Sequence, residues 1–224
     1  PSPEKLRDVF TYHLCEVESM EKKDDDTIFD INILPNRAHD LLSHQGVACE
    51  LASLLDIKYI DPMPKYKVPE SKPTKLKKTI ESLKCRRYMG RVIRNVKIGP
   101  SPDWVVKHLE SIGQRSINNI VDATNMVMYD CGQPAHVFDL AKIKNLKLTV
   151  RNAKKGEKIT LLGGAEKTLD ESMMVIADDI GNALDIAGIK GGNYAELTKD
   201  TKDIILECAN FDPTSVRKTA QVLN

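Results

Sequence analysis

Three polar residues stand where the surrounding pattern predicts apolar ones, and their types could do chemistry. Asn125 lies within DATNMVMYDC, whose apolar spacing is typical of a buried helix. His136 follows Gly132, which is expected to end that helix, and Glu207 interrupts the apolar run IILEC. An amide, an imidazole and a carboxylate can all bind a polar ligand, and the last two can also exchange protons. A polar residue that interrupts an apolar pattern usually has either a structural partner or a functional role.

Each of these residues also has a structural interpretation. His136 could be satisfied by a backbone carbonyl, and Asn125 could make a buried hydrogen bond that fixes its helix to a loop. Glu207 alternates with Leu206 and could lie on an exposed strand face, because a buried carboxylate in a strand is costly unless it is paired. A tight turn or a close approach of backbone is indicated by the glycines of AGIKGG, which are Gly188, Gly191 and Gly192.

The usual sequence signatures of catalysis are missing. The chain has no GxSxG, no P-loop, no GxGxxG after a strand, no HExxH and no HxE combined with CxxC. Its five cysteines are odd in number and form no CxxC pair, which argues against a disulfide framework or a zinc site. We therefore predict no metal site, and nucleophilic catalysis is unsupported.

The elements that would position these residues begin with an αββα unit, which we assign to residues 1–62. Ser2 and Pro3 are suited to the N-cap and the first position of an amphipathic helix. Two strands are predicted in CEVESME and TIFDINILP, joined by the charged run KKDDD. The spacing of apolar residues in DLLSHQGVACELASLL predicts a helix over residues 40–55.

Residues 63–79 are rich in proline and lysine and have little apolar periodicity, which is typical of a linker; the lysines could alternatively contact RNA phosphates. Residues 80–224 are predicted to form a larger domain with mixed helices and strands. A helix is expected in PSPDWVVKHLESIG, with Ser101 as N-cap and Pro102 at the first position. Strands are predicted in RRYMGRVIRNVKI, LKLTVRNA, EKITLLGGAEKTL, MMVIADD, ALDIAGIKGG and DIILECANF, before a last helix capped by Asp212. The predicted fold class is therefore α+β, with a substantial β-sheet in the larger domain.

Composition limits the classes of partner. The 224 residues include 33 Lys and Arg against 32 Asp and Glu, so the net charge of +1 gives no global reason to expect nucleic acid or a membrane. No apolar run approaches the roughly 20 residues of a membrane span. No signal peptide pattern precedes the first periodic segment, and we predict a cytoplasmic location and no membrane partner.

Four stretches in order, NRAHDLLSHQGVACELASLL, RSINNIVDATNMVMYDCGQPAHVFDL, AGIKGG and LECANFDPTSVRKTA, resemble the β subunit of bacterial-type phenylalanyl-tRNA synthetase. The resemblance covers nearly the whole chain. It implies that residues 1–62 are the first module of that subunit and that residues 80–224 are its editing domain, truncated at the C-terminus. In that family the editing domain hydrolyses tyrosine wrongly esterified to phenylalanine tRNA.

The same resemblance implies roles for individual residues. Asn125 and His136 resemble residues that line the editing pocket, and they are candidates for an otherwise unidentified general base. Gly188 and Gly191 resemble the glycines whose backbone forms the wall of that pocket, and Glu207 resembles the carboxylate that recognises the tyrosine hydroxyl. An aminoacyl ester is already activated, so a positioned water in a closed pocket could suffice without a serine nucleophile or a metal.

The resemblance also implies partners and cofactors. The partners are phenylalanine tRNA and the α subunit, in an assembly of two α and two β subunits. No cofactor is expected in this chain, whereas ATP and magnesium are implied for the full enzyme, which attaches phenylalanine to its tRNA.

The sequence departs from the family pattern at several points. The OB-fold tRNA-binding insertion of the first module is missing, and a short turn around DDD stands in its place. Ala135 replaces the commoner Met, and Lys190 stands where an apolar residue is usual. The family's next segment, which also contributes to the pocket, is expected beyond Asn224, so the chain could be unable to edit unaided.

Two other functions are compatible with the sequence. A non-catalytic RNA- or protein-binding module could reuse the same scaffold, because a fold does not determine a function. A small-molecule pocket on a general α+β domain is the third reading, and it would bind its ligand without competition from tRNA.

Overall fold

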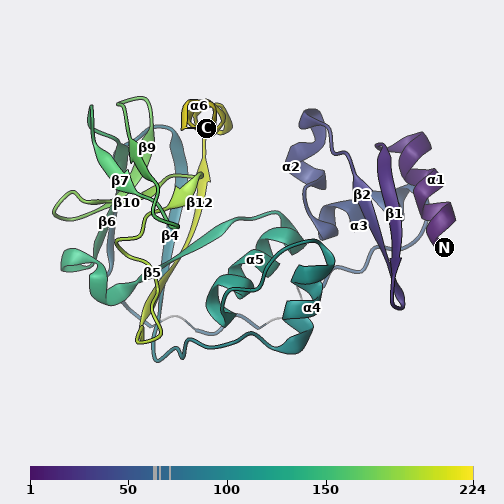
Figure 1. The fold of residues 1–224 in the computed structure, drawn as a ribbon, viewed down its shortest axis with the longest axis horizontal. Helices are drawn as coiled ribbons and strands as arrows, with labels where there is room; N and C mark the ends of the chain where they lie inside the picture. Colours follow the sequence, from purple (N-terminus) through teal and green to yellow (C-terminus); the bar gives the residue numbers. More distant parts are fainter. Residues whose placement is uncertain (63–64, 66, 71, 224) are drawn as a thin grey trace. The chain divides into compact units, whose positions relative to one another are not determined.

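The computed structural model describes residues 1–62, 65, 67–70 and 72–223, and their contacts divide the chain into two compact units. The first unit comprises Pro1–Ser71 and Pro100–Pro134, and the second comprises Lys72–Gly99 and Ala135–Asn224 (Figure 1). This division differs from the predicted boundaries, because residues 100–134 group with the first unit by their contacts.

The first unit begins with the expected order of helix, two strands and helix. Its first helix, α1, spans Pro3–His13, and the Ser2 hydroxyl caps it by accepting from the backbone N–H of Lys5 at 3.3 Å, as predicted. The strands β1 (Val17–Lys23) and β2 (Asp26–Ile31) form an antiparallel hairpin. The two strands therefore continue into the charged run, and the turn is shorter than predicted.

The prediction of one continuous helix over residues 40–55 is wrong. The chain forms a 3₁₀ turn, η1 (Pro35–Arg37), a short helix, α2 (Ala38–Leu41), and a longer helix, α3 (His44–Leu54). Ser43 breaks the pattern because its hydroxyl accepts from the N–H of Gly46 at 3.0 Å and thereby caps α3. A Cβ at Gly46 would lie 1.7 Å from the backbone oxygen of Asp40, so only glycine fits at this junction.

Two further helices complete the first unit. They are α4 (Asp103–Ser111) and α5 (Asn119–Cys131), and α5 ends at Gly132, whose positive φ of 77° confirms the predicted stop. The side chains of His44 and Gln45 on α3 bond Tyr129 O and Asp130 Oδ2 of α5 at 2.9 and 2.7 Å. These bonds explain why residues 100–134 group with the first unit.

Ser101 does not cap α4 as predicted, because Pro102 occupies the N-cap position. The Ser101 hydroxyl instead donates to the Asp122 carboxylate at 2.5 Å, and Ser116 Oγ donates to the same oxygen at 2.6 Å. The backbone N–H of Ile117 donates to the other carboxylate oxygen at 2.8 Å. Asp122 is fully buried, and these bonds compensate the cost of burying its charge at the first turn of α5.

The second unit contains a five-stranded sheet in the order β11-β10-β9-β6-β3. Its strands are β3 (Lys77–Ile80), β6 (Lys147–Asn152), β9 (Met174–Asp178), β10 (Ala183–Ile186) and β11 (Lys190–Gly191). Strand β3 pairs in parallel with β6, so the prediction of a linker through residue 79 is wrong at its C-terminal end. Residues 63, 64, 66 and 71 of the predicted linker lie outside the described residues.

A three-stranded antiparallel sheet, in the order β4-β12-β5, forms the other layer of the second unit. Its strands are β4 (Cys85–Ile93), β5 (Ala135–Asp139) and β12 (Ile204–Phe211). Strand β5, which carries His136, was not predicted, because PAHVFD is too short to show a strand period. One apolar cluster joins the two sheets, with Tyr88, Phe138 and Ile205 from this sheet and Val150 and Ile176 from the other.

Smaller elements surround the sheets. The hairpin of β7 (Lys158–Thr160) and β8 (Glu166–Thr168) turns at Gly163 and Gly164, both with positive φ, as the sequence predicts. The 3₁₀ turns η3 (Leu140–Lys142) and η4 (Lys144–Leu146) follow β5. The last helix, α6 (Pro213–Leu223), begins after Asp212, whose carboxylate accepts from the N–H of Ser215 at 2.8 Å.

The α+β class with a small αββα module and a larger, sheet-rich part is confirmed. None of the helices in the described part of the chain is long and apolar enough to cross a membrane.

Candidate functional site

The inner face of the three-stranded sheet carries two of the predicted site residues opposite each other. In the register of the central strand β12, Glu207 pairs with His136 on β5 and with Gly90 on β4. Directly opposed residues of neighbouring strands project to the same face. This face is the buried one, because Ile205, two residues before Glu207, is fully buried in the apolar cluster.

Glu207 is a buried carboxyl group that lacks a full set of partners. Its exposed fraction is 4%, and its Oε2 atom has no hydrogen-bond partner. Burial raises the pKa of this carboxyl well above its usual value, and the neighbouring Asp185 carboxyl raises it further. The exposed-face interpretation of Glu207 is therefore wrong, and the residue occupies the interior between the sheets.

His136 lies beside this carboxyl on β5 and is only partly covered. Its side chain is 28% exposed, and its ring packs edge-on against Phe138 with 4.7 Å between ring centroids. Burial lowers the pKa of His136 to about 4, so the imidazole is neutral at pH 7. Among the described residues, no backbone carbonyl accepts a hydrogen bond from this ring, so the structural interpretation of His136 finds no support.

Asp185 is a buried carboxyl that the sequence reasoning missed. It lies on β10, pairs with Ile176 on β9 and with Gly191 on β11, and is 5% exposed. Because Ile176 belongs to the cluster that joins the sheets, the shared face points toward the three-stranded sheet. Asp185 Oδ2 lies 3.9 Å from His136 Nε2, which is longer than a hydrogen bond. Its Oδ1 atom has no partner, and burial raises its pKa to about 7.

A third polar atom without a partner comes from β4. Tyr88 is only 1% exposed, and its buried hydroxyl has no hydrogen-bond partner. Burial raises the pKa of this phenol well above 10, and the charges of Glu207 and Asp185 raise it further. The alternation that singled out Glu207 within IILEC could also have found Asp185 between Leu184 and Ile186, whereas Tyr88 gave no sequence signal.

The two predicted wall glycines have different surroundings. A Cβ on Gly191 would lie 2.4 Å from Cε1 of His136, so the absence of a side chain makes room for the imidazole. Gly188 has a positive φ of 74°, and a Cβ there would lie 2.9 Å from a methyl of Val216 on α6 and 3.3 Å from the ring of Phe211. Gly191 therefore adjoins His136, whereas Gly188 adjoins the start of α6.

The structure thus brings His136, Gly191 and Glu207 together within the second unit and adds Asp185 to them. Asn125 is half-buried on α5, which belongs to the first unit. Its predicted place in the pocket stays a prediction.

The family model for the B3/4 domain matches residues 84–224 of this chain. The chain belongs to the B3/4 domain family. This match includes both sheets around the site except for β3.

Two curated relatives of this B3/4 domain protein carry the same name. The chain is 45% identical over 200 residues to the phenylalanine--tRNA ligase beta subunit of Fusobacterium nucleatum, a match covering 88% of the chain and 25% of the relative. It is also 45% identical over 202 residues to the subunit of that name from Clostridium tetani, covering 89% of the chain and 25% of the relative. The predicted resemblance is confirmed, and the chain spans about a quarter of the length of these relatives.

One solved structure covers nearly all of the chain. It is an N-terminal fragment of the phenylalanyl-tRNA synthetase beta-subunit from Pyrococcus horikoshii, with 20% sequence identity and a TM-score of 0.47. The match covers 99% of this chain and 68% of that one.

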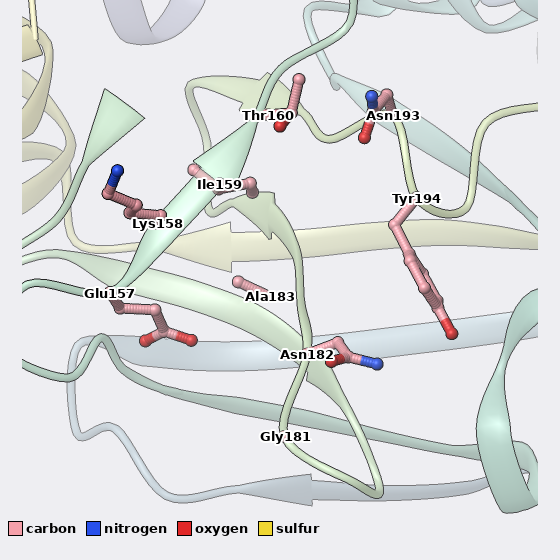
Figure 2. Close-up of a pocket in the computed structure, with 9 residues that line it drawn as sticks. All are labelled: Glu157, Lys158, Ile159, Thr160, Gly181, Asn182, Ala183, Asn193 and Tyr194. Carbon is pink, nitrogen blue, oxygen red and sulfur yellow. The ribbon is translucent and has the colours of Figure 1, made fainter. Parts of the chain in front are cut away.

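A cavity of about 300 Å³ lies elsewhere in the second unit of the B3/4 domain protein. Figure 2 shows its lining, which comes from β7, the turn before β10 and the segment after β11. Three of its polar side chains are engaged elsewhere: Glu157 pairs with Arg151, Lys158 with Glu166, and Asn182 with Asp178. None of the five predicted site residues is among its lining residues.

A second cavity, of about 250 Å³, lies beside β4. Tyr88 and Gly90 line it, and Gly90 is the residue that pairs with Glu207 across the sheet. Open space therefore reaches the strand position directly opposite the buried carboxyl. Within the described residues, no group of three or more histidine, cysteine or acidic side chains is placed to hold a metal ion.

Proposed function

We propose that this chain is part of a phenylalanine–tRNA ligase β subunit and carries the site that hydrolyses tyrosine wrongly esterified to phenylalanine tRNA. The observation that carries the proposal is the Glu207 carboxyl, which is 4% exposed and retains an unpaired oxygen opposite His136. A buried polar group in a native fold normally has a partner, so an oxygen without one suggests a place for a ligand.

The chemistry of the site suits recognition of a phenol. Glu207 would bind the tyrosine hydroxyl, and a phenylalanine side chain would leave the same carboxyl unpaired. A site of this kind can discriminate by about 10⁴-fold to 10⁵-fold against the analogue that lacks the hydroxyl. The correctly charged tRNA would therefore be spared.

Hydrolysis would require a positioned water rather than a protein nucleophile, because the ester bond is already activated. His136 has a neutral ring at pH 7 and can accept a hydrogen bond from that water or take its proton. Asn125 is the other candidate for orienting the water, on the strength of the family resemblance. Neither role needs a metal or a cofactor.

The deciding experiment compares deacylation of Tyr-tRNA and Phe-tRNA by the wild type and by Glu207→Ala. It uses both the 224-residue chain and a version extended beyond Asn224 to the length of the relatives. We expect the variant to lose most of the preference for Tyr-tRNA. Glu196→Gln is the matched control, since Glu196 is an exposed carboxyl of the same unit.

Each alternative gives a different result in this assay. Unchanged selectivity of Glu207→Ala would remove Glu207 from the proposal. If the extended wild type hydrolyses neither substrate, the non-catalytic binding module becomes the better explanation. A small-molecule pocket would instead be indicated by a ligand that binds without competition from tRNA.

The remaining parts of the proposal concern the complete enzyme. There the subunit would assemble with α subunits, in a complex of two α and two β, and would bind phenylalanine tRNA in the cytoplasm. ATP and magnesium would serve the ligation reaction elsewhere in that assembly, and no residue of this chain is assigned to them.

A further inference from the structure

Three buried polar atoms from both sheets of the second unit have no hydrogen-bond partner. They are the Tyr88 hydroxyl, Asp185 Oδ1 and Glu207 Oε2. Among the described residues, no other buried side-chain nitrogen or oxygen atom lacks a hydrogen-bond partner. Buried unpaired polar atoms are rare in native proteins, and three that interact electrostatically with one another call for a common explanation.

The surroundings of Asp185 are acidic or neutral rather than basic. Glu207 on β12 and Tyr88 on β4 interact with it electrostatically, and Nε2 of His136 on β5 lies 3.9 Å from its Oδ2. Cys85, also on β4, is a buried thiol whose pKa is raised by burial and by the charge of Glu207.

Lys78 on β3 is an exposed residue whose ammonium group bonds the backbone of β4. Lys78 Nζ donates to the backbone oxygen of Tyr88 at 2.6 Å and makes no ion pair with either carboxyl among the described residues. Two carboxylates buried together without a cation cannot both keep their charge cheaply, so a proton stays with the pair.

We propose that Asp185 is a positioning residue of the pocket, which shares one proton with Glu207 so that the two carboxyls act as a single hydrogen-bonding unit. Such a pair carries one negative charge and presents both an acceptor and a donor. It can accept from the hydroxyl of a phenol and donate to the same oxygen. The identity of the ligand rests on the proposed function, whereas the shared proton does not.

In this arrangement Asp185 contributes to the discrimination between a phenol and a phenyl ring. A phenyl ring would leave both members of the pair unsatisfied, which strengthens discrimination beyond that of an isolated carboxylate. Burial raises the pKa of both carboxyls, in agreement with a proton retained near neutral pH.

The first test measures the shared proton directly in the 224-residue chain. Asp and Glu side-chain carboxyls are labelled with ¹³C, and their chemical shifts are followed from pH 4 to pH 9. We expect one proton to remain on the pair at pH 7 in the wild type. Asp185→Asn keeps the shape of the side chain but cannot ionise, and we expect it to lower the pKa of Glu207 by at least about one unit.

Asp178→Asn is the matched control, because Asp178 is also buried in the five-stranded sheet but has partners for both oxygens in Asn182. This variant should leave the Glu207 titration where it is in the wild type. The inference is overturned if both carboxyls of the wild type are fully ionised at pH 7, or if Asp185→Asn leaves the Glu207 titration unchanged.

The second test measures selectivity against pH with the extended protein, as the ratio of kcat/KM for Tyr-tRNA and Phe-tRNA. Asp185→Ala should lower this ratio by about 10-fold or more. Asp185→Asn should restore part of it, because an amide can also donate and accept, and should flatten its pH dependence. Equal ratios in all three proteins at every pH would contradict the role of Asp185.

The two proposals can fail separately. If the titrations show a shared proton but the extended wild type hydrolyses neither substrate, the editing function fails and the carboxyl pair stands. If hydrolysis is selective but Asp185→Asn changes neither titration nor selectivity, the carboxyl pair fails and the editing function stands.

Discussion

At the scale of single residues, burial rather than pairing determines the chemistry of the site. His136 and Glu207 face each other across β5 and β12 without an ion pair, and burial favours the neutral form of both, with Asp185 adding to this effect at Glu207. The alternation of IILEC identified Glu207, but it left open whether the residue was exposed. Whether Glu207 is exposed or buried depends on the sheet that packs against β12, and a local sequence pattern does not reveal that packing.

The protonation of His136 can be measured directly. Because burial lowers its pKa to about 4, we expect the ring ¹⁵N shifts of His136 to remain those of a neutral imidazole between pH 8 and pH 5.5. Free histidine in the same buffer, with a pKa of about 6.5, is the control. Heteronuclear NMR checks this, with the signal assigned from its loss in His136→Gln. A midpoint near that of free histidine would contradict the burial of the ring.

Gly191 tests how closely the wall approaches the imidazole. In Gly191→Ala the new methyl would meet Cε1 of His136 at 2.4 Å, so the ring must move. A displacement of about 1 Å at a reacting group can cost about 100-fold in rate. We expect the rate of Tyr-tRNA deacylation to fall by about this factor in the extended protein, together with a changed His136 NMR signal.

Gly99→Ala is the matched control for this substitution. A Cβ at Gly99 would meet nothing within 4 Å, and the backbone there has no positive φ, so activity should be kept. If Gly191→Ala leaves both the rate and the His136 signal unchanged, the glycine has no role in shaping the site.

At the scale of elements, the sequence predicts those with a strong local signal and misses those made by distant pairing. Ser2, Gly132 and Asp212 mark helix ends as expected, because capping is a local hydrogen bond. Strands β3 and β5 were missed, since each is short and is completed by a partner strand more than 60 residues away in the chain. The cap of α4 was misassigned because Asp122 binds the Ser101 hydroxyl.

The contribution of the Ser43 cap between α2 and α3 to the free energy of unfolding can be measured. Ser43→Ala removes the hydroxyl that caps α3 and should lower the free energy of unfolding of the first unit by about 1 kcal/mol. Urea unfolding followed by the fluorescence of Trp104, the single tryptophan of the chain, reports on this unit.

Ser53→Ala, at an exposed position within α3, is the control and should change stability by no more than a few tenths of a kcal/mol. Equal stabilities of Ser43→Ala and Ser53→Ala would show that the Ser43 cap contributes nothing.

At the scale of the whole molecule, the sequence predicted the α+β class and the resemblance to phenylalanine–tRNA ligase β subunits, but not the grouping of residues 100–134. That grouping depends on the hydrogen bonds of His44 and Gln45 with α5, which join residues 85 positions apart. The site belongs to the second unit for a similar reason, because its residues come from strands of two sheets whose register only the folded chain defines.

The stability of the second unit should fall as the pH rises from 6 to 8. The folded-state pKa of Asp185 is raised from 3.8 to about 7, so its contribution is fully present below about pH 4 and is lost as the pH rises through 7. Glu207 acts in the same direction. His136 acts in the opposite direction, because its lowered pKa of about 4 makes its contribution grow between pH 4 and 6.5. Above pH 6.5 only the two carboxyls remain, each with a slope of up to about 1.4 kcal/mol per pH unit.

Asp185→Asn should therefore be more stable than the wild type at pH 8 and should show a smaller loss between pH 6 and pH 8. The remaining slope belongs to Glu207, whose burial persists when its like-charged neighbour is removed. Urea unfolding followed by the backbone amide signals of β12 measures this unit separately from the Trp104 signal. Asp178→Asn, which removes a buried carboxyl with a full set of partners, should keep the wild-type slope. A wild-type stability that is constant or rises from pH 6 to pH 8 would show that the two carboxyls are already ionised in the folded protein.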